Sequence, residues 1–129
     1  MPNQVEFSVH FTQLYNALSD AEQDLIDEFV FHFHKSGTKG FYGKVGPTDN
    51  VPHRDPDREK KIWYAKRHKL WHAHIGHPHW DACKNQMASY HTSNFVVHFQ
   101  KFSETSIALV DYGSHDPMTQ PKAQSLFKR

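Results

Sequence analysis

The chain has 129 residues, of which 37% are hydrophobic and 22% charged, so we expect one domain over residues 1–129 with a buried core. Lysine and arginine number 15 against 14 aspartate and glutamate residues, a near balance that does not indicate a nucleic-acid partner. No apolar run is long enough to span a bilayer and the first residues do not resemble a secretory signal, so we expect no membrane partner. A single cysteine, Cys83, favours the reducing cytoplasm.

Histidine is the unusual part of the composition. The chain has 12 histidines, spread from His10 to His115, so they are not a terminal tag. Each can change charge near neutral pH. Such a composition is compatible with acid–base chemistry, with metal binding, or with neither.

The first third of the chain predicts a strand and then a helix. Residues 5–11 alternate apolar and polar side chains, which is typical of a half-buried strand, and a turn or short helical piece follows. Ser19 and Glu22 have the spacing of a capping box. Apolar residues then recur every three or four positions until Gly37, which predicts a helix with one buried stripe.

Glycine and proline dominate residues 37–58 and predict an irregular surface segment. Residues 58–64 predict a short helical turn or the edge of a strand. Three strands are expected at 70–75, 94–102 and 107–112, and the short turn between the last two predicts an antiparallel hairpin.

This order of elements predicts an α+β domain: an antiparallel β-sheet with an N-terminal helix, or helical pair, packed on one face. The opposite face is then the more polar one. Strand alternation puts His72 and His74 on that polar face, together with His98 from the next strand.

Several short features along the chain form a set. They are the opening strand, Ser19-Asp20-Ala21-Glu22, Ser36-Gly37 followed by Phe41-Tyr42-Gly43-Lys44, His72-Ala73-His74-Ile75, Thr92-Ser93-Asn94 before Val96-Val97-His98-Phe99-Gln100, and the trailing His115. Together they resemble the RelE/ParE superfamily of bacterial toxins, and most closely its YafO-type ribosome-dependent mRNA interferases. The resemblance covers most of the chain, although no single piece is a long motif.

The resemblance implies a toxin of a type II toxin–antitoxin system. Such a protein enters the 70S ribosome, cuts the mRNA under translation and is neutralised by a cognate antitoxin. RelE-type toxins rely on arginine, lysine and a late tyrosine on the sheet. This chain carries histidines on its strand where those toxins carry arginines, so its chemistry can differ even on a shared scaffold.

RNA cleavage without a metal or other cofactor needs a base for the ribose 2′-OH, cations for the phosphorane and an acid for the leaving 5′-oxygen. We expect His72, His74 and His115 to share the base and acid roles, with Lys69 as a fourth catalytic residue that holds the phosphate. The expected RNA contacts are Lys61, Lys66, Arg67, His98, Lys101 and Tyr112. Tyr112 could equally be an ordinary residue of an amphipathic strand.

The basic segment 54–69 contains Trp63 and Tyr64, a combination typical of surfaces that bind RNA. In a toxin that works inside the ribosome, this segment would contact ribosomal RNA. The alternative is a solvated loop whose three acidic residues pair with its cations.

Other functions stay open at this stage. The histidines could form only a polar solvent-facing surface, or the run His72-x-His74-x-x-His77-x-His79 could bind a metal, with Asp81 as an additional ligand. A ParE-like toxin acting on DNA gyrase would share the scaffold but would cut no RNA. A plain interaction module would neither cut RNA nor bind metal.

Overall fold

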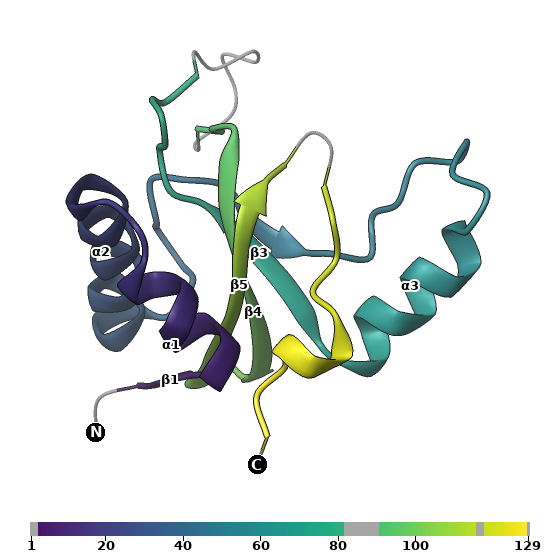
Figure 1. Ribbon diagram of the computed structural model, residues 1–129, viewed down its shortest axis with the longest axis horizontal. Coiled ribbons are helices and arrows are strands. Elements are labelled where there is room, and N and C mark those ends of the chain that lie inside the picture. Colours follow the sequence, from purple (N-terminus) through teal and green to yellow (C-terminus); the bar gives the residue numbers. More distant parts are fainter. Residues whose placement is uncertain (1–2, 82–90, 116–117, 129) are drawn as a thin grey trace.

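The computed structural model describes residues 3–81, 91–115 and 118–128, and within them the chain forms a mixed five-stranded sheet with helices on both sides (Figure 1). Cys83 lies outside these residues. The elements in chain order are β1 (Gln4–Phe7), α1 (Val9–Asn16), α2 (Asp20–Ser36), β2 (Val45–Pro47), α3 (Arg58–Arg67), β3 (Leu70–His74), β4 (Phe95–Ser103), β5 (Ser106–Ser114) and a 3-10 turn, η1 (Ala123–Ser125). The α+β class is therefore confirmed.

Helix α2 follows the expected pattern closely. The Ser19 hydroxyl accepts a hydrogen bond from the Glu22 amide at 3.2 Å, and Glu22 Oε1 accepts from the Ser19 amide at 3.3 Å. The helix ends at Gly37, whose φ of 68° is easily reached only by glycine. Its buried side chains pack on the sheet and, with Phe11, form the main core. The core residues are Phe11, Ile26, Phe29, Phe33, Ala73, Ile75, Val97, Phe99, Ile107 and Leu109.

The N-terminal strand is shorter than its alternating pattern predicts. Ser8 ends it by capping α1, because its hydroxyl accepts a hydrogen bond from the Phe11 amide at 3.1 Å. Phe7 and Phe11 still pack together, with ring centroids 4.9 Å apart, whereas Val9 between them is 77% exposed. The apolar alternation over 7–11 therefore continues into a helix.

The expectation of a wholly antiparallel sheet is wrong at one edge. The strand order is β1-β5-β4-β3-β2, and β1 pairs with β5 in parallel, while the other three pairings are antiparallel. Because β1 leads into α1 and has no hairpin turn, no local signal determines its direction. The three-residue β2 lies at the other edge, where glycine and proline are tolerated.

Both faces of the sheet are covered. Helices α1 and α2 lie on one side, and α3 with the C-terminal segment lies on the other (Figure 1). The Tyr64 hydroxyl of α3 donates to the Pro121 carbonyl at 2.8 Å, and the Phe127 amide donates to Gln100 Oε1 of β4 at 2.9 Å. The C-terminal segment therefore joins α3 to the sheet, and the polar face is not open solvent. None of the helices in the described part of the chain is both long and apolar enough to cross a membrane.

Candidate functional site

Three histidines from β3 and from the end of β5 converge on one face of the sheet. Strand β4 lies between these two strands. His72 and His74 project from the same face of β3, and His115 follows the last residue of β5. The His115 amide donates to the Asn94 carbonyl at 2.6 Å, which fixes this end of the chain beside β4. The ring centroid of His115 lies 4.8 Å from that of His74 and 5.5 Å from that of His72. The predicted convergence of these three residues is thus present.

Buried partners hold two of the three rings. His72 Nδ1 lies 3.0 Å from the hydroxyl oxygen of Thr48. His74 Nδ1 lies 2.7 Å from the carbonyl oxygen of Ser93 and 3.0 Å from its amide nitrogen. Thr48 and Ser93 are themselves buried. Nδ1 is engaged in both rings. In the His74 tautomer in which Nδ1 donates to the Ser93 carbonyl, the shorter of its two contacts, Nε2 carries the lone pair.

The rings differ in their access to solvent. His74 is only 2% exposed, whereas His72 and His115 line an open cleft of about 660 Å³. Burial, helped by the neighbouring His98 and His115, lowers the pKa of His72 to about 3. Burial also lowers the pKa of His74. Both rings are therefore neutral at neutral pH and offer lone pairs.

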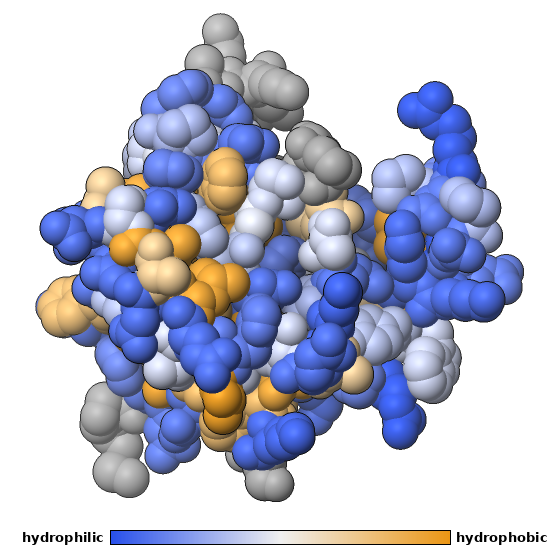
Figure 2. All heavy atoms as spheres, in the orientation of Figure 1, coloured by the Kyte–Doolittle hydropathy of each residue, from blue (hydrophilic) through white to orange (hydrophobic). Residues whose placement is uncertain are grey.

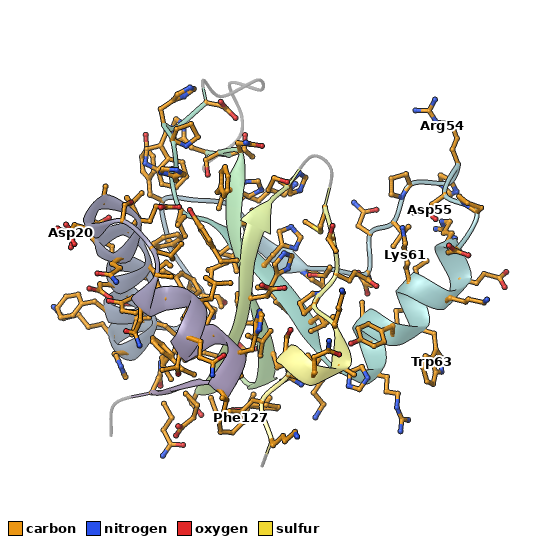
Figure 3. The ribbon with its side chains drawn as sticks, viewed as in Figure 1. Asp20, Arg54, Asp55, Lys61, Trp63 and Phe127 are labelled. Carbon is orange, nitrogen blue, oxygen red and sulfur yellow. The ribbon has the colours of Figure 1, made fainter. Side chains whose placement is uncertain are left out.

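The cleft also holds charged side chains from two other segments. Lys44 lines it just before β2, and its charge contributes to the lowered pKa values of His72 and His74. Lys61 lines it from α3 and donates a hydrogen bond to Asp55, and Figure 3 shows these two residues at the start of that helix. Lys61 was expected to contact RNA, and its place in the cleft is compatible with that.

The position of Lys44 depends on the glycine before it. A Cβ atom on Gly43 would overlap the carbonyl oxygen of His74 and would come within 2.7 Å of the Trp80 ring. The backbone can approach β3 this closely only without a side chain, and the His74 amide then donates to the Lys44 carbonyl at 2.9 Å. Lys44 was not among the expected site residues, although it stands in the segment that carried the family resemblance.

Lys69, expected beside the histidines, lies elsewhere. It connects α3 to β3 with a φ of 57° and precedes the Leu70 end of β3, whereas the histidines gather toward the His74 end. About 10 Å of strand separates it from His72, at about 3.3 Å a residue. Its side chain is exposed. In the structure, Lys44 therefore occupies the position for which Lys69 was expected.

Helix α3 carries the remaining basic candidates on an exposed surface. Lys66 and Arg67 are exposed, and the Arg67 guanidinium lies 5.3 Å from the ring centroid of Trp63, which is 62% exposed. Trp63 projects from α3 away from the sheet (Figure 3). Hydrophilic residues dominate the surface over α3 and the preceding loop, whereas hydrophobic surface gathers over α1 and α2 (Figure 2). These residues form a surface separate from the histidine cleft.

Two further candidates lie on the opposite face of the sheet. The Lys101 ammonium lies 4.1 Å from the ring centroid of Trp71, which packs against the core, and 2.9 Å from Glu104. Tyr112 also packs against the core, and its hydroxyl donates to Glu22 at 2.9 Å. Burial, with this hydrogen bond, raises the pKa of Tyr112. Neither side chain reaches the histidines.

His98 is 1% exposed, so the expectation that it contacts RNA is not compatible with its position beneath the surface. Among the residues that the structure describes, its Nδ1 has no hydrogen-bond partner, and burial lowers its pKa to about 4. The alternative of a metal cluster along 72–79 also differs from what the described residues show. His77 lies 3.7 Å from Glu22 and His79 lies 3.9 Å from Asp81, whereas His72 and His74 are joined by His115.

Comparison of this chain with family models, with curated proteins and with solved structures gives no match.

Proposed function

We propose that this protein is an endoribonuclease that cleaves mRNA on the translating ribosome, the toxin of a toxin–antitoxin pair of the YafO type. The observation that supports this proposal best is the arrangement of His72, His115 and Lys44 around one open cleft, with the buried His74 behind them. The cleft thus offers two imidazoles and a cation, the groups that metal-free RNA cleavage requires.

In this reaction the ribose 2′-oxygen attacks the adjacent phosphorus and the bond from phosphorus to the 5′-oxygen breaks. The products are a 2′,3′-cyclic phosphate and a 5′-hydroxyl. His72, which is neutral, takes the 2′-proton, and His115 gives a proton to the leaving oxygen. The bound phosphate brings negative charge into the cleft and raises the pKa of His72 back toward the working pH. Lys44 stabilises the charge that grows on phosphorus.

His74 is buried and does not line the cleft, so we assign it a positioning role. Ser93 holds its Nδ1, and its ring contacts that of His115, whose orientation it restricts. Lys66, Arg67 and Trp63 on α3 would contact ribosomal RNA, because cations next to an exposed aromatic ring bind phosphates and bases together. A message under translation as substrate would put the reaction in the cytoplasm, where a cognate antitoxin would neutralise the protein.

The test adds the purified protein to a cell-free translation reaction and maps the ends of a defined mRNA. A parallel reaction blocks initiation, and a third contains EDTA at a level that ribosomes tolerate. We expect cuts only in the translated message, and we expect them to survive chelation. An intact message in every reaction would contradict the proposal and favour a target other than RNA, such as gyrase. Cutting of the untranslated message would show that the nuclease does not need the ribosome.

A further inference from the structure

The three converging histidines are also arranged as metal ligands. One ring nitrogen from each of His72, His74 and His115 lies within 4.8 Å of the other two. Three imidazoles around a tetrahedral ion, with bonds of about 2.0–2.1 Å, place their nitrogens roughly 3.4 Å apart. Side-chain rotations that close the nitrogen separations by up to about 1.4 Å are therefore enough for all three to reach one ion.

The surroundings of the rings match those of metal-binding histidines. Such a histidine usually binds the metal through one ring nitrogen and hydrogen-bonds a protein oxygen through the other. His72 and His74 have such partners at Nδ1, the Thr48 hydroxyl and the Ser93 carbonyl, at 3.0 and 2.7 Å. Both partners are buried, so these hydrogen bonds orient the two rings before any ion arrives.

The ligand set selects the kind of ion. It consists of neutral nitrogen donors without a carboxylate, which suits zinc, cobalt, nickel or copper and not magnesium or calcium. Lys44 lines the same cleft and its charge opposes a cation, but its side chain is exposed, so water and salt screen it. The open cleft leaves a fourth coordination position for water.

We propose that His72, His74 and His115 form a binding site for one divalent ion of the zinc type. The spacing of the histidines in the sequence does not indicate this site. The third ligand, His115, follows β5, whereas His77 and His79 are closer in sequence but are not part of the cluster. Metal binding here does not require nuclease activity, so the two proposals can fail separately.

The test titrates the metal-free protein with Co²⁺ and follows visible absorption, because Co²⁺ in a tetrahedral site absorbs far more strongly than the hydrated ion. We expect one Co²⁺ per chain, displaced by one equivalent of Zn²⁺. His115→Ala and His72→Gln should each weaken binding at least about 10-fold, because losing even a residue that only hydrogen-bonds to a ligand costs about that much. Thermal unfolding of each variant checks that it is folded.

His53→Ala is the matched control, because His53 is exposed and does not line the cleft. It should bind Co²⁺ as the parent protein does. A Cys83→Ser variant tests for thiolate ligation and should also leave the spectrum unchanged. Absence of the visible bands, equal binding by His115→Ala, or loss of the bands in Cys83→Ser would each overturn the proposal, since metal would then bind weakly, elsewhere or through sulfur.

Discussion

The imidazole rings of His74 and His115 lie with their centroids 4.8 Å apart, although one belongs to β3 and the other follows β5. The contact depends on the register of β3 and β4, in which His74 pairs with Val96, and on the hydrogen bond from the His115 amide to Asn94. The sheet therefore assembles a site that no local segment contains.

Removal of a ring that lines the cleft should abolish most of the cleavage. We expect His72→Ala and His115→Ala each to lower the cleavage rate of a translated message at least about 100-fold, as for a true acid or base. His53→Ala should leave the rate unchanged. Rates are compared at saturating ribosomes, so that loss of chemistry is separated from loss of binding. Full activity in both cleft variants would show that the histidines do not carry the reaction.

Lys44 should contribute through its charge. Lys44→Ala is expected to lower the cleavage rate about 10- to 100-fold, because the phosphorane loses a nearby cation. Lys44→Arg should recover part of that loss. The control is Lys39→Ala, which removes an exposed lysine from the segment after α2. If Lys44→Ala and Lys39→Ala have the same activity, Lys44 has no part in catalysis.

Gly43 should tolerate no side chain. A methyl group there would overlap the His74 carbonyl oxygen and press on Trp80, so we expect Gly43→Ala to lower the free energy of unfolding by about 3 kcal/mol. Gly46→Ala is the matched control, since nothing lies within 4 Å of its added Cβ and its φ is not positive. Urea denaturation measures both variants. Equal stability of the two would contradict the close approach of Lys44 to β3.

His98 should make the fold sensitive to acid. Burial lowers its pKa to about 4, whereas in the unfolded chain it titrates near its ordinary value. Between these values the unfolded state binds more protons than the folded state. The free energy of unfolding therefore has its full value above the unfolded pKa and decreases as the pH falls below it. From pH 7.5 to pH 5 this group alone should cost about 2 kcal/mol of the free energy of unfolding.

The variant His98→Leu isolates that effect. It has no titrating ring, and it removes a buried nitrogen that has no partner among the described residues. Its loss of stability between pH 7.5 and pH 5 should therefore be smaller than that of the parent protein by about 2 kcal/mol. Urea denaturation at both pH values, in a buffer with chelator, provides the comparison. An identical pH dependence in the two proteins would mean that His98 titrates normally when folded.

Zinc should inhibit the nuclease. A metal ion on His72 and His115 occupies the ring nitrogens that accept and donate the protons, so one equivalent of Zn²⁺ should suppress cleavage and excess EDTA should restore it. The measurement is the cleavage rate in the translation reaction after the protein has been loaded with Zn²⁺ and freed of unbound ion. Faster cleavage by the loaded protein would instead make the ion part of the catalytic machinery.

Local patterns predict much of this fold. The capping box and the apolar stripe of α2, and the short turn between β4 and β5, each depend on neighbouring residues. The parallel direction of β1 has no such signal. The end of β1 is also obscured, since the apolar alternation continues through Ser8 into α1.

The site was predictable only in part, because local sequence patterns do not determine which distant segments pack together. Strand alternation correctly puts His72 and His74 on one face, and His115 follows from the end of the last strand. Lys44 could not be identified, because its position depends on Gly43 packing against a distant carbonyl. Lys69 was expected to converge with the histidines on one sheet face, but it precedes β3 at the end opposite His74.

The chemical nature of the cut ends tests the central claim most directly. The defined message is recovered from a translation reaction that contains the protein, and each new 5′ end is examined for a phosphate. Attack by the ribose 2′-OH with histidine acid–base catalysis predicts 5′-hydroxyl ends opposite 2′,3′-cyclic phosphates. Ends that carry a 5′-phosphate would indicate an attacking water molecule, and would contradict the mechanism assigned to His72 and His115.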